Sequence, residues 1–290
     1  MRSKYSLRAR AYLLALLPFL LLVSLFELIP VITVVIKSFL PEGGGPGFTL
    51  EHYQNIFTKK LYRSAVVNSL SVALLSSIFG LFIAFAGAKA AAGEGGRGKR
   101  LFMSVLNMVS NFSGVPLAFS YIILFGNAGV LTMAGKAWGI GFLAEFPLYT
   151  VWGLLLIYVY FQIPLATLLL IPAFDAVRKE WKEAVSLLGG NERTFWLKVG
   201  IPVLKPSLFG TFSTLFANAV SAYATAYALL MNNLSILPIR ISEQFVGDVV
   251  QRPQFGSALA VILMLMMVLS IFLNEKVLNM QKGAGQWKKA

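Results

Sequence analysis

Residues 148 to 172 read LYTVWGLLLIYVYFQIPLATLLLIP, a stretch without a single charged side chain. About 20 apolar residues in a helix are enough to cross the hydrocarbon core of a bilayer. Because lipid offers no hydrogen-bond partners, the backbone of such a stretch must pair with itself, which a helix achieves. The stretch therefore predicts a transmembrane helix.

The same pattern recurs along the chain, which is 57% hydrophobic and only 13% charged, with a mean hydropathy of +0.74. This composition is too apolar for an ordinary soluble domain. We expect an all-α polytopic membrane protein of about six helices that forms a single transmembrane domain over residues 1–290. The other five spans are expected near residues 11–38, 64–88, 101–125, 206–230 and 256–277.

The basic residues predict the orientation of these spans. The net charge is +13, but most of the 25 Lys and Arg residues fall in alternate connections, as the positive-inside rule describes. We therefore expect both termini in the cytoplasm, and the charge calls for no nucleic-acid partner. The first span follows a basic N-terminus without a small-residue cleavage site, so it is expected to be retained. The 18 residues placed inside are Arg2, Lys4, Arg8, Arg10, Lys89, Arg97, Lys99, Arg100, Arg178, Lys179, Lys182, Arg193, Lys198, Lys205, Lys276, Lys282, Lys288 and Lys289.

Two connections on the opposite side are expected to contain short helices. Residues 126–147 are rich in glycine yet apolar, and they predict a re-entrant or interfacial helix. The stretch from Leu50 to Leu61 is amphipathic and is expected to lie along the membrane surface.

Motifs of soluble enzymes are absent or misplaced. The loop from Gly93 to Arg100 fits a glycine-rich phosphate motif formally, but it joins two membrane helices rather than a strand and a helix. His52 is the single histidine, and there are no cysteines, so His52 is interpreted as a solvated loop residue and no metal or cofactor site is predicted. The chain is not expected to be an enzyme.

Polar residues within the expected spans are candidates for a substrate pathway, because burying them in lipid is costly. Glu27 lies in the first span, where contact with cargo, a structural pairing and interfacial exposure are all open. Asn107 and Asn111 share a face of the third span, and either line a pathway or bond a neighbouring helix. The fifth span carries the most polar stretch, which is interpreted as cavity lining or helix packing, and which includes Asn218, Ser221, Tyr223 and Thr225.

Residues 175–205 leave the membrane for about 30 residues, too long a segment for a simple turn. Apolar positions from Val177 to Leu188 recur at helical spacing between charged ones. Gly189 and Gly190 end that helix, and Asn191 is a good N-cap for a second one. The segment predicts two short helices joined by a glycine turn.

This loop resembles the EAA loop of permeases in binding-protein-dependent ABC importers with six-helix, type I topology. Glu183, Ala184 and Val185 match the Glu-Ala-Ala element, with Val185 in place of the second alanine. Leu188 stands where an acidic residue is common. The register is completed by Gly189, Phe195 or Trp196, Val199, Pro202 and Pro206.

The resemblance implies that Glu183 to Gly190, with Val185 and Leu188 among them, form a coupling helix that docks into an ATP-binding subunit. It further implies two such subunits carrying ATP and Mg, a second permease of similar but non-identical sequence, and an extracytoplasmic solute-binding protein. Their place would be the bacterial inner membrane. The permease itself would bind no ATP and no other cofactor.

The cargo is a weaker inference. Asn68 to Leu70 and Asn111 to Phe119 look like the branch that carries polyamines such as spermidine or putrescine, although branches for ferric iron, thiamine or aminoethylphosphonate look similar. Two other classes stay open: an ion-coupled secondary transporter driven through Glu27, and an intramembrane enzyme, for which no catalytic pair is found.

Overall fold

The computed structural model describes residues 16–43, 45–92, 96–231, 234–246 and 250–286. Six of the basic residues placed in the cytoplasm lie outside this part, as do Gly93 to Gly95; the six are Arg2, Lys4, Arg8, Arg10, Lys288 and Lys289. Internal contacts divide the chain into two compact units, residues 1–59 with 240–262 and residues 60–239 with 263–290.

The described residues are helical and contain no strand. The first unit holds η1 (Ser24–Leu28), α2 (Ile29–Lys37), α3 (Glu51–Thr58), most of α14 (Leu237–Phe245) and the start of α15 (Pro253–Gln286). The second unit holds the rest of α15 together with α4 (Lys60–Ala92), α5 (Arg97–Ser110), α6 (Val115–Phe125), α7 (Val130–Trp138), α8 (Gly141–Ala144), α9 (Val151–Asp175), α10 (Lys179–Leu187), α11 (Glu192–Phe195), η2 (Trp196–Gly200), α12 (Ile201–Ser221) and α13 (Ala224–Leu230).

Six helical runs in the described part of the chain are long and apolar enough to cross a membrane, which confirms the predicted fold class. The third and fifth runs differ from the prediction: the third is Val115–Trp138 rather than 101–125, and the fifth is Glu192–Ser221 rather than 206–230. The third predicted span is interrupted between residues 110 and 115. α5 ends at Ser110, and Gly114 has a φ of +71°, a backbone angle that favours glycine. The six runs are Leu16–Lys37, Lys60–Ala92, Val115–Trp138, Val151–Asp175, Glu192–Ser221 and Pro253–Lys276.

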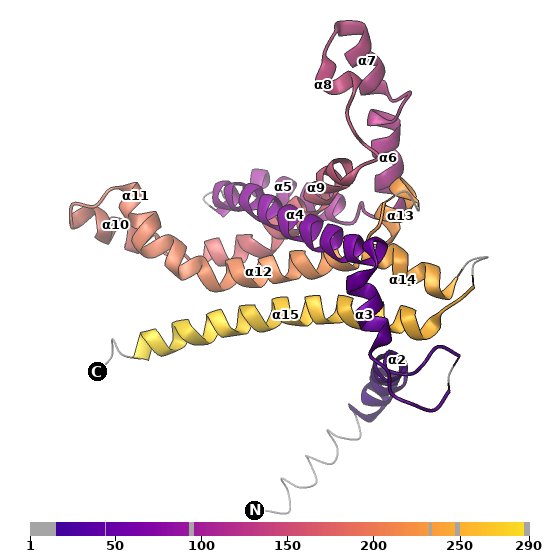
Figure 1. Cartoon of the computed structure of the whole chain (residues 1–290). Coiled ribbons are helices and arrows are strands. Elements are labelled where there is room, and N and C mark those ends of the chain that lie inside the picture. The colour runs from indigo at the N-terminus through magenta and orange to yellow at the C-terminus, as the bar shows by residue number, and fades with distance from the viewer. Residues whose placement is uncertain (1–15, 44, 93–95, 232–233, 247–249, 287–290) are drawn as a thin grey trace, which may run out of the picture. The chain divides into compact units, whose positions relative to one another are not determined.

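The core of the second unit is formed by α4, α9 and α12, which lie side by side (Figure 1). A Cβ added at Gly80 of α4 would lie 3.1 Å from Cβ of Gln162 in α9, so the two helices approach closely there. The buried Gln162 donates to Ser76 Oγ at 2.6 Å and accepts from Ser77 Oγ at 3.3 Å. Small residues and interhelical hydrogen bonds of this kind hold membrane helices together.

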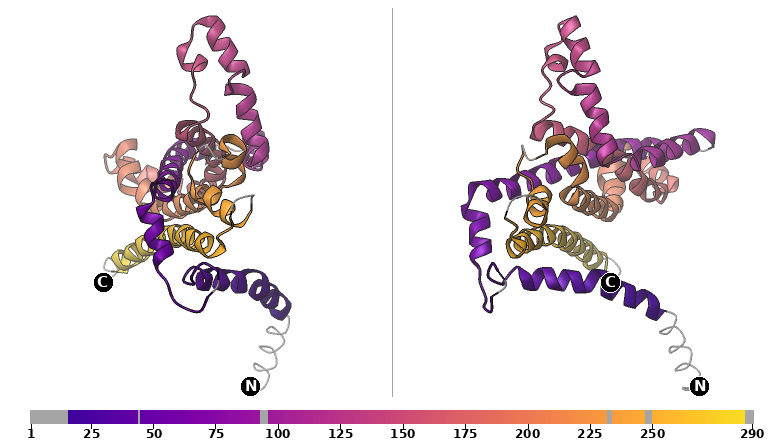
Figure 2. Two further views of the ribbon diagram at one scale, coloured as in Figure 1. Left: turned by 45° about the vertical axis from the view of Figure 1, so that its right-hand side comes forward. Right: turned by 90° about the vertical axis from the view of Figure 1, so that its right-hand side faces the viewer.

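The segment 126–147 contains two short helices, α7 and α8, rather than one. They extend from the second unit at the opposite end of α9 from α10 and α11, as Figures 1 and 2 show. A Cβ added at Gly135 would lie 2.7 Å from Cβ of Leu143, so the two helices touch where α7 lacks a side chain. A re-entrant or interfacial position for this pair stays a prediction.

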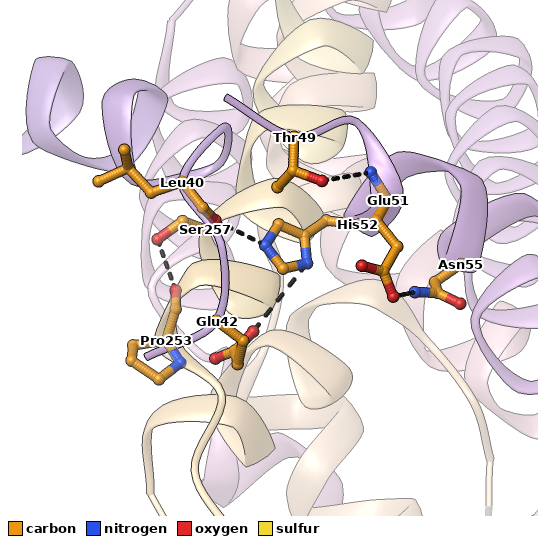
Figure 3. A network of polar contacts seen from close by, with 8 residues as sticks. All are labelled: Leu40, Glu42, Thr49, Glu51, His52, Asn55, Pro253 and Ser257. Atoms are coloured by element: carbon orange, nitrogen blue, oxygen red, sulfur yellow. Dashed lines mark hydrogen bonds and ion pairs between the residues drawn. The ribbon is translucent and has the colours of Figure 1, made fainter. Parts of the chain in front are cut away.

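His52 in α3 is buried, and the prediction of a solvated residue is wrong. The loop that follows α2 folds back over the ring, so that Nε2 donates to the Leu40 carbonyl at 2.8 Å (Figure 3). Its Nδ1 lies 4.0 Å from a carboxylate oxygen of Glu42, and the ring centroid lies 6.0 Å from that of Phe255. His52 therefore fastens this loop to α3 within the first unit.

Candidate functional site

The turn between α10 and α11 is a Schellman motif, in which backbone groups at the end of a helix bond one another. Gly189 has a φ of +77°, its N–H donates to the Ser186 carbonyl at 3.0 Å, and the Gly190 N–H donates to the Val185 carbonyl at 2.9 Å. A Cβ on Gly190 would lie 2.6 Å from Val185 Cγ1. Gly189 is thus required for its backbone angle, and Gly190 is required because a side chain there would collide with Val185.

The second helix of the loop starts where the sequence predicts. Asn191 caps α11, because its Oδ1 accepts from both the backbone N–H and the hydroxyl of Thr194 at 2.9 Å. A π-helical turn, η2, then leads into α12, and a Cβ on Gly200 would collide with the Trp196 ring at 2.5 Å.

An aromatic cluster attaches this loop to the helical bundle of the second unit. The Trp196 ring lies 5.9 Å from Phe174 at the end of α9 and 6.3 Å from Phe85 in α4, while Phe85 and Phe174 are 5.0 Å apart. Phe195, beside Trp196, is buried. We refer to Phe85, Phe174 and Trp196 as the aromatic anchor.

Charged groups surround the anchor. Lys89 of α4 lies over the Trp196 ring at 4.6 Å, and both Lys89 and Lys182 of α10 come within 4 Å of Glu192, at 3.8 and 3.7 Å. Trp196 Nε1 donates to a carboxylate oxygen of Glu192 at 3.3 Å.

The loop presents an exposed tip beyond these attachments. Leu187 and Leu188 are 89% and 87% exposed, and Glu183 and Ala184 are exposed beside them. An open hollow of about 890 Å³ lies beneath α10, with Lys89, Phe174 and Trp196 in its lining. Leu187 and Leu188 thus form an exposed apolar pair at the tip of the loop.

The second feature of the site is a pair of helix breaks. α5 gives way to α6 at residues 111–114, and α12 gives way to α13 at Ala222, whose ψ is 96°. The two breaks meet, because Thr225 Oγ1 donates to the Gly114 carbonyl at 3.2 Å. Tyr158 of α9 donates to the Ala222 carbonyl at 2.6 Å and so pairs a carbonyl at the break. Discontinuous helices within membranes frequently line substrate sites.

The predicted pathway residues divide at these breaks. Asn111, Asn218 and Ser221 are exposed, and Asn218 and Ser221 share a face of α12. Thr225 was expected on that face but is buried, because the helix is interrupted before it. Tyr223 is half-buried and stacks on Tyr227 at 5.2 Å.

Asn107 and Asn111 bond backbone carbonyls of their own helix, which are Met103 at 2.9 Å and Asn107 at 2.7 Å. One predicted role for these two amides was a hydrogen bond to a neighbouring helix. The hydrogen bonds described for them stay within their own helix instead.

Glu27 lies apart from these residues, in the first unit. It is exposed within the π-helical turn η1, midway along the run Leu16–Lys37. Turns of this kind often mark functional positions.

Several residues of the site were missed by the sequence reasoning. Lys89 and Phe85 belong to a span that gives no sign of contact with a loop 100 residues later. Gly114 and Ala222 interrupt apolar runs that read as continuous. The glycine just before Val115 and Pro116 is a start signal for a new helix, and it could have located the first break.

Comparisons with known proteins bear on this arrangement. A family model described as "Binding-protein-dependent transport system inner membrane component" matches residues 76–278. The chain is 25% identical to the sulfate transport system permease protein CysW of Synechocystis, over 95% of both chains. It is also 25% identical to the trehalose permease SugB of Mycobacterium tuberculosis, over 93% of this chain and 92% of that one.

Two further similarities are more limited. The thiamine permease ThiP of Brucella abortus is 26% identical over 65% of this chain and 34% of its own length. The structure superposes with a TM-score of 0.72 on a chain of a bacterial alginate ABC transporter in complex with an alginate-pentasaccharide-bound periplasmic protein. That match covers 94% of this chain and 97% of the other at 14% identity, so it supports the fold.

Proposed function

The chain belongs to the family of binding-protein-dependent transport system inner membrane components, the permeases of ABC importers, and we propose that its exposed loop tip couples it to ATP hydrolysis. In this proposal the tip around Glu183 to Gly190 docks on an ATP-binding subunit. The observation that carries it is the pair of exposed leucines held on a loop that the aromatic anchor fixes to α4 and α9.

The proposed coupling is mechanical. A helix that is capped, closed by two glycines and fixed at its base transmits a displacement better than a flexible segment does. Closure of two ATP-binding subunits would move the tips of two permeases and alternate access to a pathway between them. The chain would act as one transmembrane domain that binds no ATP, while ATP and Mg reside on the partners.

The proposed pathway runs along the exposed polar residues at the helix breaks, where Asn111, Asn218 and Ser221 would face a second permease of similar, non-identical sequence. Solute would arrive from an extracytoplasmic binding protein, as the periplasmic protein in the alginate transporter structure suggests. We place the chain in a bacterial inner membrane with both termini in the cytoplasm, on the basis of its basic residues.

A polyamine such as spermidine or putrescine stays a proposal for the cargo that rests on the resemblance alone. The named relatives carry sulfate, trehalose and, with a shorter match, thiamine, so their names do not favour a polyamine. Family membership removes the reason to prefer an ion-coupled transporter. Binding measurements on the partner binding protein, with spermidine, sulfate, trehalose and thiamine as ligands, distinguish these cargoes.

Glu183→Arg tests the coupling role. In the complex reconstituted with its ATPase and binding protein, we expect transport per ATP hydrolysed to fall about tenfold or more, as loss of a central interface contact does. Glu180→Arg, an equally exposed reversal in the first turn of α10, serves as the control. Full transport by Glu183→Arg and by the more disruptive Ala184→Trp would contradict the proposal.

A further inference from the structure

His52 of α3 is held between two oxygen atoms, both from the loop that joins α2 to α3. Its Nε2 donates to the Leu40 carbonyl at 2.8 Å, and its Nδ1 lies 4.0 Å from a carboxylate oxygen of Glu42 (Figure 3). A carbonyl oxygen can only accept, so the hydrogen bond to Leu40 requires a proton on Nε2 whether the ring is neutral or charged. The charge of the ring is therefore decided at Nδ1, the atom that faces Glu42.

This arrangement gives the neutral and the charged ring opposite relations to Glu42. In the neutral ring Nδ1 presents a lone pair to the carboxylate, so two acceptors face each other. A protonated Nδ1 is instead a positively charged donor, which attracts the same carboxylate. Uptake of a proton by His52 thus draws the loop toward α3.

The surrounding elements bring no competing charge within the same distance of the ring. On α15 the neighbour of His52 is Phe255, with 6.0 Å between the ring centroids. In α14, the charged side chains Arg240 and Glu243 bond each other at 2.7 Å. Among the residues that the structure describes, Glu42 is the one charged group within 4.0 Å of the ring nitrogens. The charged side chains of the adjoining segments are exposed, namely Lys37 at the end of α2, Glu51 in α3, which accepts from Asn55, and Arg252 before α15.

The base of the loop is closed by contacts that do not change charge near neutral pH. The Thr49 N–H donates to the Phe39 carbonyl at 2.8 Å, and the rings of Phe39 and Phe48 stack at 5.2 Å. The Tyr53 hydroxyl donates to Ser38 Oγ at 2.8 Å. A change in the charge of His52 should therefore act on the part of the loop around Glu42 and leave the base closed.

We propose that His52 and Glu42 form a pH-sensitive clasp that closes the loop onto α3 when His52 takes up a proton. Histidine is the side chain whose charge ordinarily changes between about pH 5 and 8, and this chain contains a single histidine. The charged pair adds stability at acid pH, and that contribution is lost as the pH rises and the ring gives up its proton. Acid thus stiffens the connection between the run Leu16–Lys37 and α3. The clasp lies within the first unit and does not depend on the coupling role.

Hydrogen exchange of the full chain in phosphatidylcholine nanodiscs tests the clasp, at about pH 5.5 and about pH 8. Both values lie above the range in which carboxyl groups ordinarily titrate, and they bracket that of histidine. After correction for the intrinsic pH dependence of exchange, the amides of Glu42 and Gly43 should be about two- to fivefold better protected in acid, the effect of one partly exposed ion pair. The Thr49 amide at the base should show no such difference.

Two variants with the same loss of charge separate the clasp from a general effect of acid. Glu42→Gln removes the partner of His52 and should abolish the difference between the two pH values. Glu51→Gln removes an exposed carboxylate next to His52 in the sequence and should leave the difference as in the parent. Both side chains are exposed, so neither variant should prevent folding.

The ring itself can be read in a chain labelled with ¹⁵N-histidine, because one histidine gives one pair of imidazole signals. We expect Nε2 to be protonated at both pH values and Nδ1 to be protonated only at the lower one.

Four results would overturn the proposal. These are equal protection around Glu42 at the two pH values, an unchanged pH response in Glu42→Gln, and a neutral ring that carries its proton on Nδ1. The fourth is weaker protection in acid, which would mean that the cost of burying a charged ring exceeds the gain from pairing it with Glu42.

Discussion

Gly189 and Gly190 lie side by side in the loop, yet substitution of each by alanine should act by a different route. Gly189→Ala leaves contacts unchanged but places a side chain at a φ of +77°, which costs about 1–2 kcal/mol for an L-residue. Gly190→Ala keeps an ordinary backbone but drives its Cβ into Val185.

Hydrogen exchange of residues 179–200 separates the two effects. We expect Gly189→Ala to raise exchange at the turn alone, and Gly190→Ala to raise it along α10 as well, because Val185 must move. Gly98→Ala, in open space on α5, is the control. Identical exchange patterns for the two loop variants would contradict this account.

His52 offers a second test at the level of a single side chain. His52→Phe keeps the ring packing on Phe255 but leaves the Leu40 carbonyl without its donor, which should destabilise the loop by about 1–3 kcal/mol. Faster hydrogen exchange of residues 38–49 is the expected result. Gln54→Ala, at an exposed position of the same helix, is the control and should leave that exchange unaltered. Unchanged exchange of the loop in His52→Phe would show that the hydrogen bond does not fasten it.

At the level of elements, a hydrogen bond from Thr225 to the Gly114 carbonyl joins the break α5–α6 to the break α12–α13. Thr225→Val preserves the shape of the side chain and removes the donor to the Gly114 carbonyl. With a cost of about 1 kcal/mol, exchange around residues 111–114 and 222–226 should rise together by roughly fivefold. Thr214→Val is the matched control, since Thr214 bonds only its own helix, at Gly210. A rise at one break without the other would mean that they are not joined.

The elements also show what sequence can predict here. Length and hydropathy predicted the number of spans and the positions of four of them, but misplaced the third and the fifth. Gly189, Gly190 and Asn191 predicted the ends of the two loop helices, because helix ends depend on local chemistry. The break at Ala222 was not predictable, since alanine favours helix and the interruption is held by Tyr158 from another element. The anchor was missed for the same reason: Phe85 and Trp196 are distant in sequence, and an aromatic residue in an apolar run carries no sign of its partner.

For the whole molecule, the predicted orientation can be tested directly because the chain contains no cysteine. Single cysteines at Leu187 and at Gln54 provide one exposed reporter in the loop and one in α3. In intact cells a membrane-impermeant thiol reagent should label Gln54→Cys, and it should reach Leu187→Cys only in inverted vesicles. The cysteine-free parent is the blank. Labelling of Leu187→Cys from outside would reverse the orientation assigned from the basic residues.

The aromatic anchor joins the loop and the adjoining ends of α4 and α9 into one lever arm. Since Trp196 is packed against Phe174 and Phe85, the loop and the adjoining ends of α9 and α4 should turn as one piece about the place where the helices are interrupted. A displacement at Leu187 would then also move the helix ends on the far side of that pivot. If Leu187 is the point that is driven, the arm from Leu187 to the breaks sets the rotation that a given displacement produces, so a chain with a longer α4 and α9 would need more travel there for the same rotation.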